Sequence, residues 1–151
     1  MGHIDFVKEA GERIFQRDEF EAGDNAALAQ SLAQQVGYLG LSVKDLQVQY
    51  KNGTATLKGA VATQAEREKI VLVVGNTQGV GRVDDRLTVD KKEPEATYYT
   101  VKAGDNLGKI AKTYYNNAMK HPVIFEANRP MLNDPNHIYP GQVLRIPPLQ
   151  D

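Results

Sequence analysis

Apolar and polar residues alternate in two segments that flank the dipeptide Asn52-Gly53. Asn-Gly is the strongest short signal for a two-residue β-hairpin turn, because both turn positions need positive φ. If Lys51 pairs with Thr54, one face of the hairpin is apolar and the other carries Gln, Lys and Thr, as in a sheet covered on one side only. The pairs predicted on the apolar face are Tyr50–Ala55, Val48–Leu57 and Leu46–Gly59.

Two segments whose apolar residues have helical spacing are predicted to cover the apolar face of this sheet. Residues 25–36 carry apolar side chains at i, i+4 and i+8, and residues 63–74 end in an apolar run. The second segment begins with Thr63 three residues before Glu66, the spacing of a capping box. The side chains expected to face the sheet are Leu28, Leu32, Val36, Ile70, Val73 and Val74.

A further strand is predicted at residues 82–89, where Val83, Leu87 and Val89 share a face and Asp85 is a charged exception on it. The order helix, strand, strand, helix, strand predicts a small α+β sandwich.

The N-terminal segment has apolar residues at three- and four-residue intervals, which predicts an amphipathic helix or two short helices. Charged residues interrupt it, so it lacks the apolar core of a signal peptide. No apolar run approaches the roughly 20 residues of a membrane span, and the polar face of the segment mixes both signs of charge. We therefore expect a cytoplasmic protein that does not bind membranes. The spaced residues are Ile4, Val7, Gly11, Ile14 and Phe15.

A second module follows the charged, proline-containing segment at residues 89–97, which is typical of a linker. A strand at residues 98–102 precedes a helix that Asp105 can cap, and Pro122 favours the start of another short helix. The sequence YPGQ at residues 139–142 has Pro and Gly at the centre of a type II turn. A closing strand at residues 142–147 completes the order strand, helix, helix, strand.

Composition excludes several functions. The net charge is −1, from 18 basic and 19 acidic residues, and no basic stripe is interleaved with aromatic residues, so we expect no nucleic acid partner. The absence of cysteine excludes disulfides, thiolate metal sites and a cysteine nucleophile. The spacings of His3, His121 and His137 suit no metal site, and neither serine lies in a nucleophile elbow. We expect no catalytic residues and no enzyme activity.

The motifs of both modules resemble known domains. Residues 98–147 resemble a LysM domain through the sequences VKAGDNL, IFEAN and YPGQVLRIP, in that order. The hairpin VQYKNGTATLKG, followed by GVGRVDDRL, resembles a BON domain. This interpretation divides the chain into a BON domain with the N-terminal helical segment at residues 1–89, a linker at 90–97 and a LysM domain at 98–151.

The combination, with FVKEAGE near the start, resembles the bacterial potassium-binding proteins of the BON–LysM type. That resemblance implies a cytoplasmic monomer that binds or senses K⁺ and becomes more compact when it does. K⁺ has a low charge density and suits neutral carbonyl oxygens, whereas carboxylate clusters favour Ca²⁺ or Mg²⁺. The last carbonyls of the helix that ends near Gly75, and those of the segment before Gly11, can be free of helical partners.

The resemblance places the K⁺ ligands on main-chain carbonyls in these two segments. Carried onto matching positions, they are Val7, Lys8, Ala10, Gly75, Thr77 and Val80. Two alternatives remain. The LysM module can bind peptidoglycan, a polymer containing N-acetylglucosamine, although Asn106 and Gly108 stand where a hydroxyl residue is usual. Both modules can also serve protein contacts without a ligand. The expected glycan-binding residues are Asp105, Asn106, Leu107, Ile138 and Tyr139.

Overall fold

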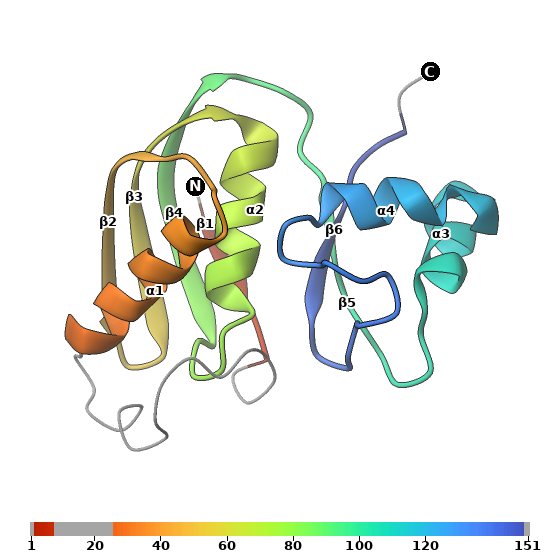
Figure 1. Ribbon diagram of the computed structural model, residues 1–151, viewed down its shortest axis with the longest axis horizontal. Helices are drawn as coiled ribbons and strands as arrows, with labels where there is room; N and C mark the ends of the chain where they lie inside the picture. Colours follow the sequence, from red (N-terminus) through yellow and green to blue (C-terminus); the bar gives the residue numbers. More distant parts are fainter. Residues whose placement is uncertain (1, 8–25, 150–151) are drawn as a thin grey trace.

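The computed structural model describes residues 2–7 and 26–149, which form two domains lying side by side (Figure 1). The described part of the N-terminal domain consists of β1 (Gly2–Asp5), α1 (Ala26–Tyr38), β2 (Lys44–Lys51), β3 (Thr54–Thr63), α2 (Gln64–Gly75) and β4 (Arg82–Lys91). The C-terminal domain consists of β5 (Thr97–Thr100), α3 (Leu107–Tyr115), the 3₁₀ turn η2 (Ala118–Lys120), α4 (His121–Ala127) and β6 (Val143–Ile146). The predicted α+β class is confirmed.

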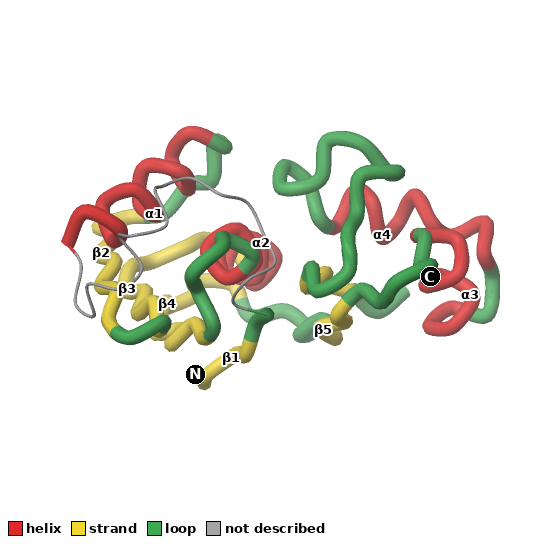
Figure 2. Tube along the Cα trace, turned by 90° about the horizontal axis from the view of Figure 1, so that it is seen from below, coloured by secondary structure: helices red, strands yellow, loops and turns green. Residues whose placement is uncertain are grey.

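The strands of the N-terminal domain form one sheet in the order β1-β4-β3-β2. β3 and β4 are parallel and joined by α2, whereas the outer pairs are antiparallel. Both helices cover the same face of the sheet, and α2 also lies between the sheet and the C-terminal domain (Figure 2). A helix covered on two sides needs apolar residues around most of its circumference. The consecutive buried residues of α2 are Ile70, Val71, Leu72, Val73 and Val74.

The predicted hairpin register is confirmed for three pairs: Lys51 with Thr54, Tyr50 with Ala55, and Val48 with Leu57. The fourth predicted pair, Leu46 with Gly59, is replaced by a bulge, because the register shifts between Lys44 and Gln47, where Asp45 has φ +57°. The displaced strand passes close to Gly59, where an added Cβ would lie 3.1 Å from the Lys44 carbonyl oxygen. Glycine at this position therefore permits the bulge.

The two helices predicted to cover the sheet lie where expected. Leu28, Leu32 and Val36 of α1 have no exposed surface. At the start of α2, the Thr63 hydroxyl accepts a hydrogen bond from the Glu66 amide at 3.1 Å, which confirms the cap. Asp85, the charged exception in β4, is 4% exposed. Its carboxylate lies 2.8 Å from Nε of Arg67 in α2, so a cation on the covering helix compensates the buried charge.

The N-terminal segment differs from the sequence-based expectation. Gly2–Asp5 is a strand that pairs with β4, with Ile4 opposite Val83. Here Ile4 and Phe6 pack against the core, whereas Asp5 is exposed and pairs with Arg82 at 2.9 Å. This alternation has the period of a strand, and pairing satisfies backbone groups along β4. The rest of the predicted helical segment, including Gly11, Ile14 and Phe15, lies outside the described residues.

In the C-terminal domain β5 and β6 pair antiparallel, and α4 begins near Pro122 as predicted. The turn at residues 139–142 is confirmed by the hydrogen bond from the Gln142 amide to the Tyr139 carbonyl and by φ +91° at Gly141. Asp105 is not the cap of α3. Asn106 caps this helix by accepting from the Lys109 amide at 2.8 Å, while Asp105 accepts from the Lys102 amide.

Candidate cation site

The loop that joins α2 to β4 is buried rather than lying on the surface. Thr77 is 1% exposed and Val80 has no exposed surface. Three bonds hold this loop in place. The Thr77 hydroxyl donates to the Val73 carbonyl at 2.9 Å, the Val80 amide donates to the Thr77 carbonyl at 3.1 Å, and the Tyr50 hydroxyl donates to the Gly79 carbonyl at 2.7 Å. Burial raises the pKa of Tyr50, so its hydroxyl stays protonated and continues to donate.

The N-terminal segment reaches the same loop. The Phe6 amide donates to the Gly81 carbonyl at 3.0 Å. The Phe6 ring lies against Gly75, and a Cβ at this position would overlap the ring. Because Val7 follows Phe6 directly, the segment after β1 lies beside the loop after α2.

The structure describes four of the six residues whose carbonyls are predicted K⁺ ligands. Gly75, Thr77 and Val80 lie on the buried loop, and Val7 lies on the adjoining segment, whereas Lys8 and Ala10 are outside the described residues. The Thr77 carbonyl accepts a hydrogen bond from the Val80 amide, which closes the loop over the end of α2. The loop follows the C-terminus of α2, where the helix dipole is negative and favours a cation.

The described part of the chain offers no cluster of metal-ligating side chains near this loop. Among the residues that the structure describes, His, Asp and Glu nowhere gather in a group of three that could hold a metal ion.

The same loop touches the C-terminal domain through Asn76. Its side-chain oxygen accepts from the Val143 amide at 2.8 Å, and its Nδ2 donates to the Val143 carbonyl at 2.8 Å. Asn128 makes the same pair of bonds with Arg145 from inside the C-terminal domain. β5 pairs with one side of β6, so the two asparagines bond the backbone on its other side at alternate residues.

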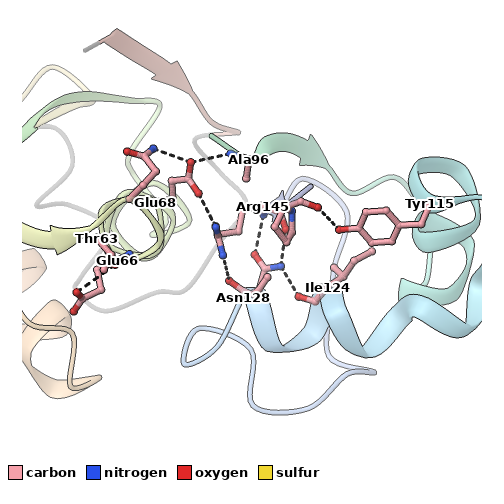
Figure 3. A network of polar contacts seen from close by, with 11 residues as sticks. Thr63, Glu66, Glu68, Ala96, Tyr115, Ile124, Asn128 and Arg145 are labelled. Carbon is pink, nitrogen blue, oxygen red and sulfur yellow. Dashed lines mark hydrogen bonds and ion pairs between the residues drawn. The ribbon is translucent and has the colours of Figure 1, made fainter. Parts of the chain in front are cut away.

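A buried ion pair also joins the domains (Figure 3). Nε and Nη2 of Arg145 both lie 2.8 Å from Oε1 of Glu68, and the side chains are 8% and 2% exposed, respectively. The other Glu68 oxygen accepts from Gln64 at 2.8 Å and from the Ala96 amide at 2.9 Å. Each oxygen of the Glu68 carboxylate therefore accepts two hydrogen bonds. One of them comes from the backbone just before β5, which is thereby bonded to α2.

Tyr98 of β5 lies near this ion pair. Burial, together with the negative charges of Glu68 and Asp85, raises the pKa of Tyr98 well above its usual range. The phenol therefore remains neutral at the interface.

The sequence interpretation did not identify Asn76, Glu68 or Arg145 as interface residues. One signal was present: two residues after Glu68, α2 has five consecutive apolar residues, a run too long for a helix covered on one side only. Such a run indicates a second packing surface, but it does not indicate what packs there.

Of the five residues expected to bind glycan, two line the cavity between the domains. Ile138 and Tyr139 line a cavity of about 490 Å³ between the domains, together with Val73 and Thr77 of the N-terminal domain. Asp105, Asn106 and Leu107 are not part of its lining. Asp105 accepts from the Tyr99 hydroxyl, and Leu107 is buried in the C-terminal core.

The comparisons with known proteins agree with this architecture. The family model described as BON domain matches residues 24–91, and the model described as LysM domain matches residues 99–147. None of the helices in residues 2–7 and 26–149 has the length and apolar character needed to cross a bilayer. The fold and the matches define a two-domain protein that joins a BON domain to a LysM domain.

Relatives extend the comparison to the whole chain. The chain is 40% identical to "Potassium binding protein Kbp" of Escherichia coli O6:H1 over 149 residues. The alignment covers 97% of this chain and 99% of the relative. An uncharacterized protein of Deinococcus radiodurans is 32% identical over 141 residues, covering 85% of this chain and 55% of its own length. The chain belongs to the BON–LysM family that includes Kbp.

Proposed function

We propose that this protein binds K⁺ in the cytoplasm through main-chain carbonyls of its BON domain. The observation that carries the proposal is the convergence of two segments, Phe6–Val7 and Gly75–Gly81, in a chain 40% identical to a potassium binding protein. The ligands proposed are the carbonyl oxygens of Val7, Lys8, Ala10, Gly75, Thr77 and Val80. The proposal assigns the chain no catalytic step.

Neutral ligands explain why a monovalent ion is the proposed occupant. A ring of carbonyl dipoles can replace the water shell of K⁺, whereas Mg²⁺ and Ca²⁺ are held by carboxylates. The buried position of Thr77 and Val80 lowers the local dielectric constant, which strengthens each ion–dipole contact.

Ion binding is proposed to favour the compact arrangement of the two domains. An ion shifts a conformational equilibrium only if it binds one state better than the other. The loop proposed to hold the ion is continuous with Asn76, which bonds the LysM domain. The proposed ion-binding loop and the domain interface both belong to a single chain, so the proposed function needs only a monomer.

The test is a cation titration of the full chain at constant ionic strength, starting in tetramethylammonium chloride. KCl is expected to raise the melting temperature and lower the radius of gyration, because a ligand that binds only the folded state stabilises it by about 2.7 kcal/mol at one hundred times its Kd. NaCl and MgCl₂ serve as matched controls. Equal responses to KCl and NaCl, or none to KCl, would refute selective K⁺ binding.

Peptidoglycan binding is a second candidate because of the LysM match. Ile138 and Tyr139 face a cavity shared with the BON domain, so a glycan chain there competes with domain docking. If K⁺ favours docking, retention on purified peptidoglycan is expected to fall when KCl replaces tetramethylammonium chloride. Cell fractionation separates the two functions, because contact with peptidoglycan requires export.

A further inference from the structure

Asn76 lies in the loop of the proposed K⁺ site, and its side chain contacts the LysM domain. In the chain it stands between Gly75 and Thr77, whose carbonyls are two of the proposed K⁺ ligands. In space its side chain bonds the backbone of β6 in the LysM domain. It is 5% exposed. A single residue therefore joins the proposed ion site to the other domain.

The contact between Asn76 and β6 is specific in geometry. The side-chain amide accepts from the Val143 N–H and donates to the Val143 carbonyl, as a neighbouring strand would. Hydrogen bonds weaken steeply when their donor and acceptor are misaligned. A pair of opposed bonds to one residue therefore forms only over a narrow range of Asn76 positions.

The backbone around Asn76 sets the position of this side chain. Its own N–H donates to the Leu72 carbonyl at 2.8 Å and ends α2. The next residue, Thr77, is fixed to the end of α2, because its hydroxyl donates to the Val73 carbonyl. Movement of the peptide units on either side, as when carbonyls turn toward an ion, moves the Asn76 side chain with them.

We propose that Asn76 is the positioning residue that couples K⁺ binding to docking of the LysM domain. This inference rests on the proposed function and deepens it. When K⁺ gathers the carbonyls of Gly75 and Thr77, the peptide units between them are held in the orientation that aligns the Asn76 amide with Val143. When the ion leaves, the loop loses that orientation and the two bonds to β6 weaken.

The coupling must act in both directions. If K⁺ strengthens docking by a given factor, docking strengthens K⁺ binding by the same factor. Substituting Asn76 is therefore expected to weaken K⁺ binding although its side chain touches no ion. Couplings of this kind typically amount to about 5- to 150-fold in affinity.

Hydrogen exchange of two backbone amides tests the coupling in the unmodified protein. The Val143 amide donates to Asn76 across the interface, whereas the Arg145 amide donates to Asn128 within the LysM domain. Adding KCl is expected to slow exchange at Val143 by at least about 5-fold, in line with typical coupling factors, and to change exchange at Arg145 much less. Equal slowing at both amides, or none at Val143, would overturn the inference.

Two variants then isolate the side chain. Asn76→Ala removes the amide, and Asn76→Gln keeps an amide but moves it one methylene further out. Both are expected to bind K⁺ with an apparent Kd about 5-fold higher or more, and to show no K⁺-dependent decrease in the radius of gyration. The glutamine variant supplies the comparison if the alanine variant fails to fold. Asn128→Gln is the matched control, because it displaces the equivalent amide within one domain.

The outcomes separate this inference from the proposed function. If the unmodified protein shows no K⁺-specific response, the proposed function fails and the coupling falls with it. If the unmodified protein responds and both Asn76 variants keep its Kd and its compaction, the coupling alone is refuted. A variant that stays folded yet binds no K⁺ would make Asn76 a part of the ion site and also refute the coupling.

Discussion

Arg145 of β6 and Glu68 of α2 form a buried ion pair, with two guanidinium nitrogens 2.8 Å from the same carboxylate oxygen. The two residues are separated by 77 positions and belong to different domains. The remaining bonds of both groups are satisfied, since Arg145 Nη1 donates to the Ala127 carbonyl at 3.0 Å and Glu68 accepts from Gln64 and Ala96. The pair therefore fixes the LysM domain on the face of α2 that points away from the sheet.

Replacing Glu68 with glutamine is expected to destabilise the protein by about 3 kcal/mol or more, because removing one partner leaves a buried charge unpaired. Urea denaturation followed by tyrosine fluorescence measures the change. Glu126→Gln is the matched control, since Glu126 pairs with Arg129 at the surface, where loss of a pair costs at most about 1 kcal/mol. Similar losses in both variants would contradict the assignment of Glu68.

Substituting Gly75 with alanine is expected to weaken K⁺ binding and lower the melting temperature, because the new Cβ overlaps the Phe6 ring. Gly37→Ala is the control: no heavy atom lies within 4 Å of a Cβ added there, and alanine in a helix gains about 0.5–1 kcal/mol over glycine. The double variant Phe6→Ala/Gly75→Ala tests the cause. Restored binding in the double variant is expected, and its absence would show that Phe6 is not the obstacle.

Removing the Tyr50 hydroxyl with Tyr50→Phe leaves the buried Gly79 carbonyl without this donor, which is expected to cost about 1–3 kcal/mol. The loop after α2 should lose order, seen as faster exchange of the Val80 and Gly81 amides. Tyr38→Phe is the control, since Tyr38 is 86% exposed. Unchanged exchange in the loop would show that the hydroxyl does not hold it.

The stabilisation that Asp105 gives the LysM domain is expected to be lost at low pH. Hydrogen bonds from the Tyr99 hydroxyl and the Lys102 amide lower the pKa of Asp105. A carboxylate with a depressed folded pKa stabilises the fold above its unfolded pKa of about 3.9, and this contribution is lost as the pH falls through the folded value.

The variant Asp105→Asn makes this contribution measurable. The difference in free energy of unfolding between the unmodified protein and the variant is expected to be largest near pH 6 and to shrink below pH ~4, where Asp105 protonates. A difference that stays constant over this range would show that the charge of Asp105 is not involved.

Features encoded within a few residues were predicted from the sequence and confirmed. The turn at Asn52-Gly53 sets the register of the hairpin near it, and the capping box places the start of α2 at Thr63. The prediction failed further from the turn, because the bulge at Asp45 depends on close approach to Gly59 rather than on the alternating pattern.

Short or long-range features were harder to predict. Four residues are too few to distinguish strand from helix by periodicity, and β1 forms because β4 offers a free backbone edge. The bonds of Asn76 to Val143 span 67 positions and leave no local pattern. Main-chain carbonyl ligands have no side-chain signature, so the proposed ion site came from family resemblance rather than from residue chemistry.

Asn76 and Asn128, which bond the backbone of β6, affect how much of that strand is open to other molecules at high protein concentration. When the domains separate, the N–H and carbonyl of Val143 are uncovered, whereas those of Arg145 stay covered by Asn128 within the LysM domain. Exposed backbone on a strand invites strands of other molecules to add. In the docked arrangement Asn76 covers this part of β6, so these backbone groups are not open to another strand.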